Sequence, residues 1–409
     1  MRLSIRVAVA ACVGATTVAG CVAPPNWGGG PAPTTSTTST STTSTSTSTT
    51  TTLLAGPAVR RVSSLAGGES SGAVVSRNGR YVAFTSTSTA LGADGNGPGL
   101  DVFRWDRTTG TVLRLTGGNA PATTPTVADD GAVAFESTAT DLAGADANNQ
   151  GSDVFLWTAS GVVRVTAGNF ASGNPVISSD GTRVVLHSFG DLAGVGSAGA
   201  VSWRRVGGTF TRLVADTVGH TYLPRAVTST GNLVLLDDGG SLRLHDTSVP
   251  SSLATVAEAS SSPPFTFVIP MAGVHALADD GDVVYTNDTV WVLGTPTVVS
   301  GSLARYDRQT GSTVGLGNAA VPIAAGQSPD GRYVVSTEIA SGAAFTIGAL
   351  GTVRHTDRTT GVVTTVAAAA TGSTLSSTGR DVAFDSNRLD PAPDANGAGL
   401  DAFSWDRGS

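Results

Sequence analysis

The chain of 409 residues has a net charge of -7, and only 13% of its residues are charged. This composition offers no basic surface for a nucleic-acid backbone, so we expect no nucleic-acid partner. All 24 cationic residues are arginine, and the absence of lysine excludes both a Walker-type phosphate loop and Schiff-base catalysis. Both cysteines, Cys12 and Cys21, lie near the N-terminus, so the body of the chain contains neither a disulfide nor a thiolate metal site.

Residues 1–21 predict an export signal. Arg2 and Arg6 precede an apolar run over 7–18 that is too short to span a bilayer. The tetrad Val18–Cys21 (VAGC) resembles the bacterial lipobox, in which the cysteine is diacylated and becomes the new N-terminus. We therefore expect a lipoprotein signal peptide, with lipid on Cys21 holding the protein to the outer face of the bacterial cell membrane. The alternative is an ordinary signal peptide in which Cys21 has no role.

Residues 22–57 predict a disordered tether. Every residue from Thr34 to Thr52 is serine or threonine, and prolines flank the segment on both sides. Such a composition has no apolar face to bury. Fully extended, these 19 residues reach about 60 Å, which would carry a folded head away from the membrane.

A repeat begins after Pro57. Its marker is a glycine that follows a short polar residue, as in Asn78-Gly79 and Asp180-Gly181, which is typical of hairpin turns that need a positive φ angle. These glycines recur at spacings of 52, 50, 50, 50, 50 and 48 residues, at Gly79, Gly131, Gly181, Gly231, Gly281, Gly331 and Gly379. A period near fifty residues predicts seven copies of one supersecondary unit.

Each copy contains short apolar runs separated by turns. In the first copy the runs are centred on residues 73–75, 81–84, 102–105 and 112–115. The third run usually carries a large aromatic residue such as Trp105, which at one position per copy would pack one sheet against the next. Each copy is therefore predicted to be a four-stranded antiparallel sheet.

The last copy stops one strand short, at residues 405–407, and the missing strand is found at the other end of the domain. Residues 58–62 resemble the fourth runs of other copies, so we expect this segment to complete the last sheet and close the ring. The predicted fold of residues 58–409 is all-β, a seven-bladed β-propeller of four-stranded antiparallel blades. Arginines on the outermost strands are expected to be solvated charges that discourage edge-to-edge pairing, at Arg61, Arg114, Arg164 and Arg212.

Two recurrent patterns resemble a known family. Ser-x-Asp-Gly-Arg-x-Val-Ala-Phe and Asp-Val-Phe-x-x-Asp-Arg-x-Thr-Gly are similar to the WD-like propeller repeats of TolB-type proteins. The match covers almost all of the chain after Pro57 and is best in copies one, two, six and seven, whereas copies three to five rest more on spacing. The resemblance implies a β-propeller outside the cytoplasm that binds protein partners and performs no catalysis.

Antiparallel alternation places the loops between strands two and three on the same rim as the connections between copies. Three of these loops share a pattern of alternating Asp and Asn oxygens with a later carboxylate, which is typical of calcium ligands. Each loop offers only three side chains, and the alternative is that they form Asx-turns in which the last Asp caps the third strand. The residues are Asp94, Asn96 and Asp101; Asp146, Asn148 and Asp153; and Asp394, Asn396 and Asp401.

The connection between copies four and five, residues 260–271, is longer and more apolar than its counterparts. It carries Phe265, Phe267, Ile269 and Met271 on the loop-rich rim. These residues would either form a patch that binds a partner or fold over the ring and become buried.

These observations favour a non-enzymatic binding or scaffolding head, displayed at the cell envelope for protein partners. We expect no cofactor, with Ca²⁺ as the one candidate. A propeller lyase or hydrolase is the alternative, although the five histidines occupy different positions in their copies and assemble no convergent set. A glycan-binding module is a third possibility, for which Trp27 or Trp291 would supply an aromatic surface.

The interpretation of the acidic loops as Asx-turns predicts that calcium has no effect on stability. The melting temperature of the protein should be the same in millimolar Ca²⁺ as in excess chelator, because a ligand stabilises a fold only by binding it. A calcium-dependent rise in the melting temperature would assign the loops to the cation instead.

Overall fold

This computed structural model describes residues 58–63, 68–90, 95–144, 151–192, 194, 197–239, 241–250, 252–258, 261–262, 266–268, 275–287, 290–292, 302–316, 320–340, 350–387 and 399–408. All of them belong to one compact unit, Leu53–Ser409. Cys21 and the predicted tether lie outside the described residues. Within the ranges above, no helix is long and apolar enough to cross a membrane.

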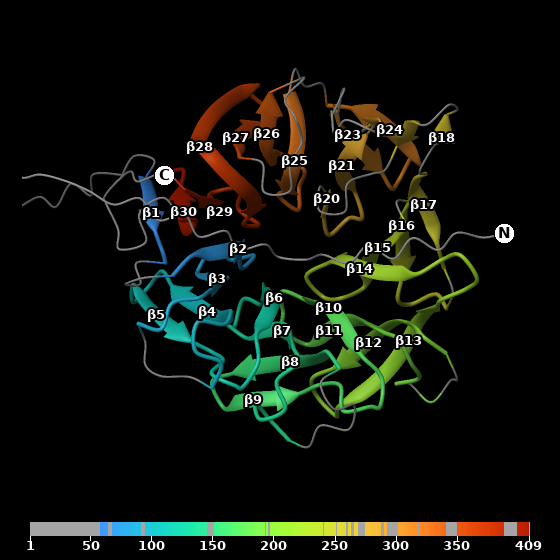
Figure 1. Cartoon of the computed structure of the whole chain (residues 1–409). Helices are drawn as coiled ribbons and strands as arrows, with labels where there is room; N and C mark the ends of the chain where they lie inside the picture. The colour runs from blue at the N-terminus through green and yellow to red at the C-terminus, as the bar shows by residue number, and fades with distance from the viewer. Residues whose placement is uncertain are drawn as a thin grey trace, which may run out of the picture. The chain divides into compact units, whose positions relative to one another are not determined.

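The described elements are strands, paired antiparallel in sheets, most of which have four strands (Figure 1). The first sheet comprises β2 (Ser70–Val75), β3 (Tyr81–Ser86), β4 (Asp101–Asp106) and β5 (Thr111–Arg114). The second comprises β6 (Ala122–Val127), β7 (Val133–Ser137), β8 (Asp153–Thr158) and β9 (Gly161–Arg164). The third comprises β10 (Ser172–Ile177), β11 (Arg183–Ser188), β12 (Gly199–Arg204) and β13 (Thr209–Ala215). The fourth comprises β14 (Tyr222–Val227), β15 (Leu233–Asp238), β16 (Ser241–Asp246) and β17 (Ala254–Ala257).

The later part of the chain contains three further sheets. One comprises β20 (His275–Leu277), β21 (Val283–Asn287), β23 (Ser302–Asp307) and β24 (Ser312–Gly315). A small sheet comprises β18 (Ser261–Ser262), β19 (Thr266–Val268) and β22 (Val290–Val292). A seven-stranded sheet runs in the order β1 (Ala58–Arg61), β30 (Asp401–Asp406), β29 (Asp381–Ser386), β28 (Val362–Leu375), β27 (Gly351–Asp357), β26 (Tyr333–Ala340) and β25 (Ala320–Gln327).

The seven-stranded sheet differs from the separate four-stranded sheets that the repeat predicts, and β28 is the reason. The first half of β28 pairs with β27 and is the outermost strand of the sixth repeat. Its second half pairs with β29 and is the first strand of the seventh repeat. Ala370 pairs with both neighbouring strands. The strand changes partner next to Ala369, whose φ of 53° is a left-handed conformation that breaks the regular pleat. One continuous strand therefore joins the last two repeats.

The N-terminal strand pairs with the last strand of the chain, as the sequence predicts. Ala58 is opposite Asp406, and Arg61 is opposite Phe403. The blue β1 and the red β30 lie side by side in Figure 1. The strand missing from the last repeat is thus supplied from the other end of the domain.

The repeat glycines occupy the turns that the sequence predicts. Each has a positive φ, between 65° and 96°, and the amide of Gly79 donates to the carbonyl of Ser76 over 2.9 Å. At Gly379 a side chain would also collide with the ring of Tyr333, because an added Cβ would lie 2.0 Å from Cδ2. Backbone conformation and close packing both favour glycine there.

The core consists of apolar layers between neighbouring sheets. Alternate residues of β3 face opposite sides: Tyr81 and Ala83 join a cluster with the second sheet, whereas Val82 and Phe84 join a cluster with β29 and β30. Phe84 stacks on Phe103 with ring centroids 5.6 Å apart. Trp105 of β4 belongs to the same cluster as residues of β29 and β30, so this aromatic residue packs one sheet against the next, as predicted.

Arginine side chains join neighbouring sheets at the edges of these layers. Arg104 lies between the rings of Tyr81 and Trp157, 4.6 Å from each centroid, and donates to the carbonyl of Gly131 over 2.6 Å. Burial lowers the pKa of this guanidinium. A planar cation between two aromatic faces suits such a joint because it stacks on both at once.

A buried carboxyl connects the last repeat to the first. Asp385 on β29 accepts hydrogen bonds from the amides of Gly72 and Ala73 on β2, over 2.7 and 3.1 Å. Burial raises the pKa of Asp385 to about 7, against the effect of the two amide donors. On the same interface, Arg107 forms ion pairs with Asp381 and Asp406 over 2.8 and 3.0 Å.

The pKa of Asp385 predicts a pH dependence of stability. A pKa raised from 3.8 to about 7 means that the folded state holds this proton more tightly than the unfolded state. The contribution to the free energy of unfolding is therefore full below about pH 4 and is lost as the pH rises toward 7. Denaturant unfolding of the wild type and of Asp385→Asn from pH 4 to 8 should show this loss in the wild type only, and parallel curves would contradict it.

Candidate functional site

The two rims of the sheets differ in what they carry. The turn rim holds the turns between first and second strands and those between third and fourth, which meet where the amide of Arg107 donates to the carbonyl of Arg80 over 2.9 Å. The loop rim holds the loops between second and third strands and the connections between repeats. There the amide of Gly95 donates to the carbonyl of Gly117 over 3.2 Å. Among the calcium-loop candidates named above, Asn96 lies in a loop of this rim, and Asp101, Asp153 and Asp401 begin the strands that leave it.

Only part of the predicted calcium loops is described. Asn96, Asp101, Asp153 and Asp401 lie within the described residues, and the other candidates lie outside them, namely Asp94, Asp146, Asn148, Asp394 and Asn396. The three described aspartates each begin a third strand or its equivalent, β4, β8 and β30. Their surroundings can therefore be compared directly.

The three aspartates make the same contacts. Asp153 accepts a hydrogen bond from the hydroxyl of Thr166 over 2.8 Å and pairs with Arg164. The equivalent sets are Asp101 with Thr116 and Arg114, and Asp401 with Ser63 and Arg61. Each aspartate thus joins the start of one strand to the end of the strand beside it.

The expectation that the outer-strand arginines are solvated edge charges is wrong for three of them. The side chains of Arg61, Arg114 and Arg164 are 9%, 9% and 3% exposed. Each guanidinium lies over a phenylalanine ring and pairs with a buried carboxylate. The sequence pattern that indicates these pairs is Arg-x-Ser or Arg-x-Thr, at residues 61–63, 114–116 and 164–166. Each copy of the pattern corresponds to one of the three aspartates.

These contacts bear on the calcium hypothesis. Each described aspartate has its carboxylate engaged by a hydroxyl and a guanidinium, so a cation there would have to displace an arginine. Across the described ranges, no three His, Cys, Asp or Glu side chains are grouped so as to hold a metal ion. Calcium binding by the loops remains a prediction, and it rests on the candidate residues other than Asp101, Asp153 and Asp401.

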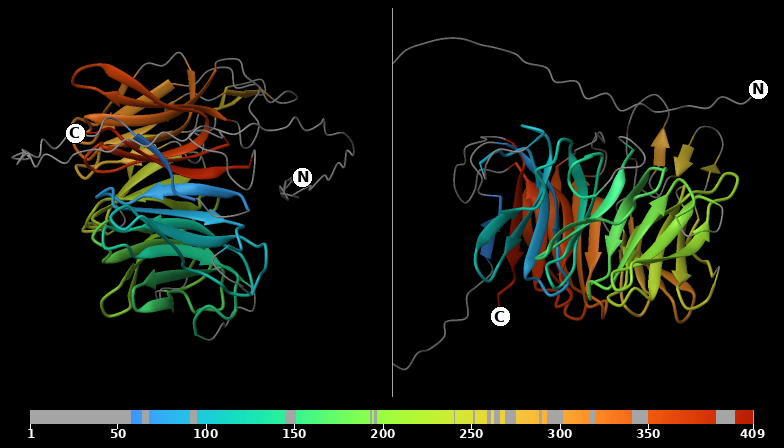
Figure 2. Two further views of the ribbon diagram at one scale, coloured as in Figure 1. Left: turned by 90° about the vertical axis from the view of Figure 1, so that its left-hand side faces the viewer. Right: turned by 90° about the horizontal axis from the view of Figure 1, so that it is seen from below.

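The apolar connection after the fourth sheet contributes to a small sheet. In it Phe267 on β19 is opposite Trp291 on β22, which belongs to the loop between β21 and β23. Phe265, Ile269 and Met271 lie outside the described residues. Figure 2 shows these short strands standing beyond the ends of the neighbouring sheets. Two loop-rim segments that are separate in sequence are therefore paired.

The histidines with described side chains do not converge. His187 contacts Asp216 over 2.9 Å, and His220 contacts Asp238 over 2.8 Å. The other two contact backbone carbonyls, His245 at Ser252 and His355 at Gly379, each over 2.7 Å. Burial lowers the pKa of both His245 and His355, which keeps these imidazoles neutral within the sheets.

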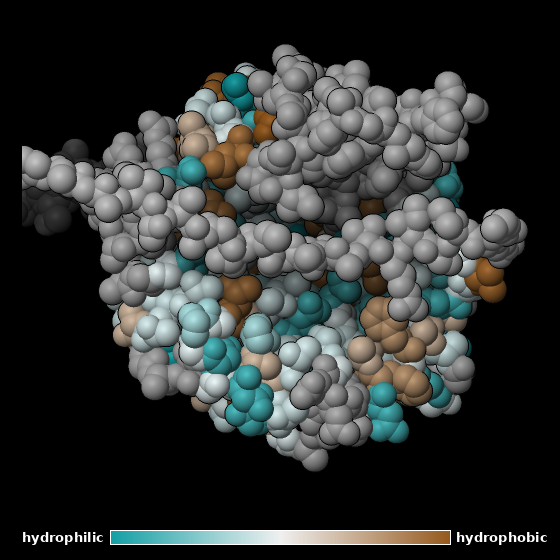
Figure 3. Space-filling view, viewed as in Figure 1, coloured by the Kyte–Doolittle hydropathy of each residue, from teal (hydrophilic) through white to brown (hydrophobic). Residues whose placement is uncertain are grey.

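Large apolar side chains are exposed on the loop rim of the third sheet. Phe170 is 47% exposed, Phe189 is 61% exposed and Val218, in the connection between β13 and β14, is 99% exposed. Apolar residues gather over this part of the molecule in the lower right of Figure 3. Of these side chains, Phe189 packs edge-on against the buried His187, with ring centroids 4.7 Å apart.

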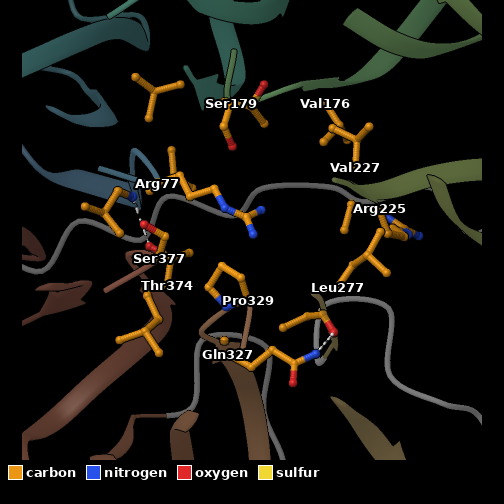
Figure 4. A pocket seen from close by; sticks show the side chains of 18 of the residues that line it. Arg77, Val176, Ser179, Arg225, Val227, Leu277, Gln327, Pro329, Thr374 and Ser377 are labelled. Atoms are coloured by element: carbon orange, nitrogen blue, oxygen red, sulfur yellow. Dashed lines mark hydrogen bonds between the residues drawn. The ribbon is translucent and has the colours of Figure 1, made fainter. Parts of the chain in front are cut away.

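A cavity of about 230 Å³ lies where the first strands of the sheets converge (Figure 4). Its walls come from β2, β6, β10, β14, β20, β25 and β28, and are formed by small and branched side chains such as Val75, Val176 and Leu277. Sequence reasoning missed it because every repeat contributes only two to four residues. Its charged lining residues are Arg77 and Arg225.

Comparison with solved structures decides the fold. An oligogalacturonate lyase in complex with manganese is 13% identical, with a TM-score of 0.54 over 85% of this chain and 92% of that one. The β-propeller domain of the Trilobed protease from Pyrococcus furiosus is 10% identical, with a TM-score of 0.52 over 83% of this chain and 95% of the domain. The chain is a β-propeller. At such low identities the likeness extends to the fold alone.

The match to TolB from Acinetobacter baumannii is weaker. The two chains are 15% identical with a TM-score of 0.43, and the match covers 69% of this propeller chain and 62% of TolB, less than two thirds of that protein. We draw no argument from it. No family model matches the chain, and no curated protein matches it either.

The buried Asp–Arg pairs predict a large asymmetry between arginine substitutions. Arg164→Met should lower the free energy of unfolding by about 3–5 kcal/mol, because it leaves Asp153 buried without its cation. Arg205→Met is the matched control, since Arg205 and its partner Asp130 are 32% and 45% exposed, and it should cost less than about 1 kcal/mol. Equal losses in denaturant unfolding would contradict the assignment.

Proposed function

We propose that this chain is a non-catalytic binding protein whose sheets form a ring of seven blades, closed by the pairing of β1 with β30. Lipid on Cys21 anchors it to the outer face of the cell membrane, and residues 22–57 act as the tether. The loop rim is the surface that meets protein partners of the cell envelope.

The observation that carries this proposal is the way in which the described polar residues are used. Carboxylates, guanidinium groups and hydroxyls that recur in the repeat join one strand or one sheet to the next, as in Asp153, Arg164 and Thr166. His245 and His355 likewise contact backbone carbonyls. An enzyme needs an acid, a base or a nucleophile directed at one point, and a binding surface does not.

The exposed apolar residues support a protein partner. Large apolar side chains exposed on one rim favour an interaction surface, and Phe170, Phe189 and Val218 are exposed on the loop rim. The small sheet that pairs Phe267 with Trp291 belongs to the same rim. A glycan partner that stacks on Trp291 is the second outcome that the experiments below distinguish.

Cross-linking of the full lipidated chain on intact cells tests the surface. Phe189→Ser combined with Val218→Ser should reduce the yield of the main cross-linked protein several-fold, because the exposed apolar area is lost. Val206→Ser is the matched control, since Val206 is 86% exposed on the turn rim, and it should leave the yield unchanged. Equal effects of the two substitutions would overturn the assignment of the rim.

A second experiment tests the non-catalytic part of the proposal. The purified full chain is incubated with envelope polysaccharide, peptidoglycan and peptide substrates, and the products are followed by mass spectrometry. We expect no new product from any of these substrates and no retained polysaccharide. Turnover of a polymer would make the protein an enzyme, and retention of polysaccharide alone would make it a glycan-binding module.

A further inference from the structure

The cavity at the first strands has the features of a site for a small ligand. Valine, alanine and leucine side chains line it together with polar side chains from the turns and from β6, β14, β25 and β28. A concave site that combines apolar side chains with placed polar groups is typical of ligand binding. A volume of about 230 Å³ equals that of about eight waters, so a ligand there has roughly eight non-hydrogen atoms.

Arg77 is the charged side chain that points into the cavity. It extends from the turn between β2 and β3, and Figure 4 shows its guanidinium near the middle of the space. Arg225 lines the opposite wall but points away from the centre in Figure 4, toward Asp237, with which it pairs over 2.7 Å. Of the two arginines that line the cavity, only Arg77 therefore directs its guanidinium into the space.

The carboxylate that neutralises Arg77 comes from another repeat. Nη2 of Arg77 lies 2.6 Å from Oδ2 of Asp279, in the turn between β20 and β21. The two atoms are too poorly aligned for a hydrogen bond, and Nη2 has no other partner among the described residues. Asp279 also accepts hydrogen bonds from the amide and hydroxyl of Ser229, over 2.8 and 2.9 Å, so its charge is stabilised without Arg77.

Asp129 is the second acidic group at this end of the cavity. It accepts a hydrogen bond from the amide of Asn78 over 2.7 Å, and burial raises its pKa, against the effect of Arg77. Neither Asp129 nor Asp279 is among the residues that line the cavity. A ligand inside the cavity therefore meets the guanidinium before it meets either carboxylate.

Arg77 is also a departure from the repeat. At the position before the turn pair, the other copies carry aspartate, serine or proline, at Asp129, Ser179, Ser229, Asp279, Pro329 and Ser377. Those residues are short, whereas the arginine reaches across the space between the first strands. The position that differs is thus the one that places a guanidinium in the cavity.

We propose that this cavity binds a small organic acid, with its carboxylate on Arg77 and its short aliphatic chain between Val75, Val176 and Leu277. The acid takes the place of Asp279 on the guanidinium, which offers paired N–H donors that match a carboxylate. Asp279 keeps its hydrogen bonds to Ser229 during this exchange. This site is separate from the loop rim, so either proposal can fail without the other.

Titration calorimetry of the full chain with hexanoate tests the site, because hexanoate has eight non-hydrogen atoms and a single carboxylate. Saturable binding at one site is expected. Hexanamide, which has the same shape without the charge, should bind about tenfold more weakly or not at all, since hydrogen bonds to a charged group are the stronger ones. Equal binding of the two compounds, or none of hexanoate, would overturn the proposal.

Two substitutions should change the affinity for hexanoate in opposite directions. Arg77→Gln should weaken binding about tenfold or more, whereas Asp279→Asn should strengthen it several-fold by removing the competing carboxylate. Arg80→Gln is the matched control in the same turn, because Arg80 is 45% exposed and pairs with Asp106 instead. A higher affinity for hexanoate in the Asp279→Asn variant cannot result from misfolding. If Asp279→Asn does not raise the affinity and Arg77→Gln does not lower it, the site is refuted.

Discussion

The sheets whose second strands are buried on both faces depend on their neighbouring sheets for stability. The second strands β3, β15 and β29 are buried at all six of their positions, so neither face of these sheets meets water. A four-stranded sheet of this kind is stable only when another sheet covers each side. Repetition of one unit satisfies the requirement for inner sheets, and the pairing of β1 with β30 joins the two ends of the series.

Burial on both faces also determines where polar groups appear. A buried donor or acceptor must find a partner inside the protein. Asp153 binds Thr166 and Arg164, and Asp385 accepts the two amides at the start of β2. Such groups hold strands and sheets in register, which is why a chain with few charged residues places several of them where water does not reach.

Function then depends on the parts in which the copies differ. Residues at the repeated positions pack in the core or form internal ion pairs and hydrogen bonds. The surfaces that remain are the loop rim and the cavity between the first strands. On the loop rim, the copies differ in the exposed apolar side chains of Phe189 and Val218. In the cavity it is Arg77, whose counterparts in the other copies are short side chains.

The sequence by itself determined the strand pattern, the turns at the repeat glycines, and the pairing of residues 58–61 with the last strand, because period, turn chemistry and alternation are local properties of the chain. It did not determine the burial of Arg61, Arg114 and Arg164, which depends on an aspartate from the adjacent strand. It also did not reveal that β28 is continuous or that Phe267 is opposite Trp291. The cavity belongs to the tertiary structure alone, since its wall is assembled from a few residues of each first strand and its charge balance joins Arg77 to Asp279, about two hundred residues away.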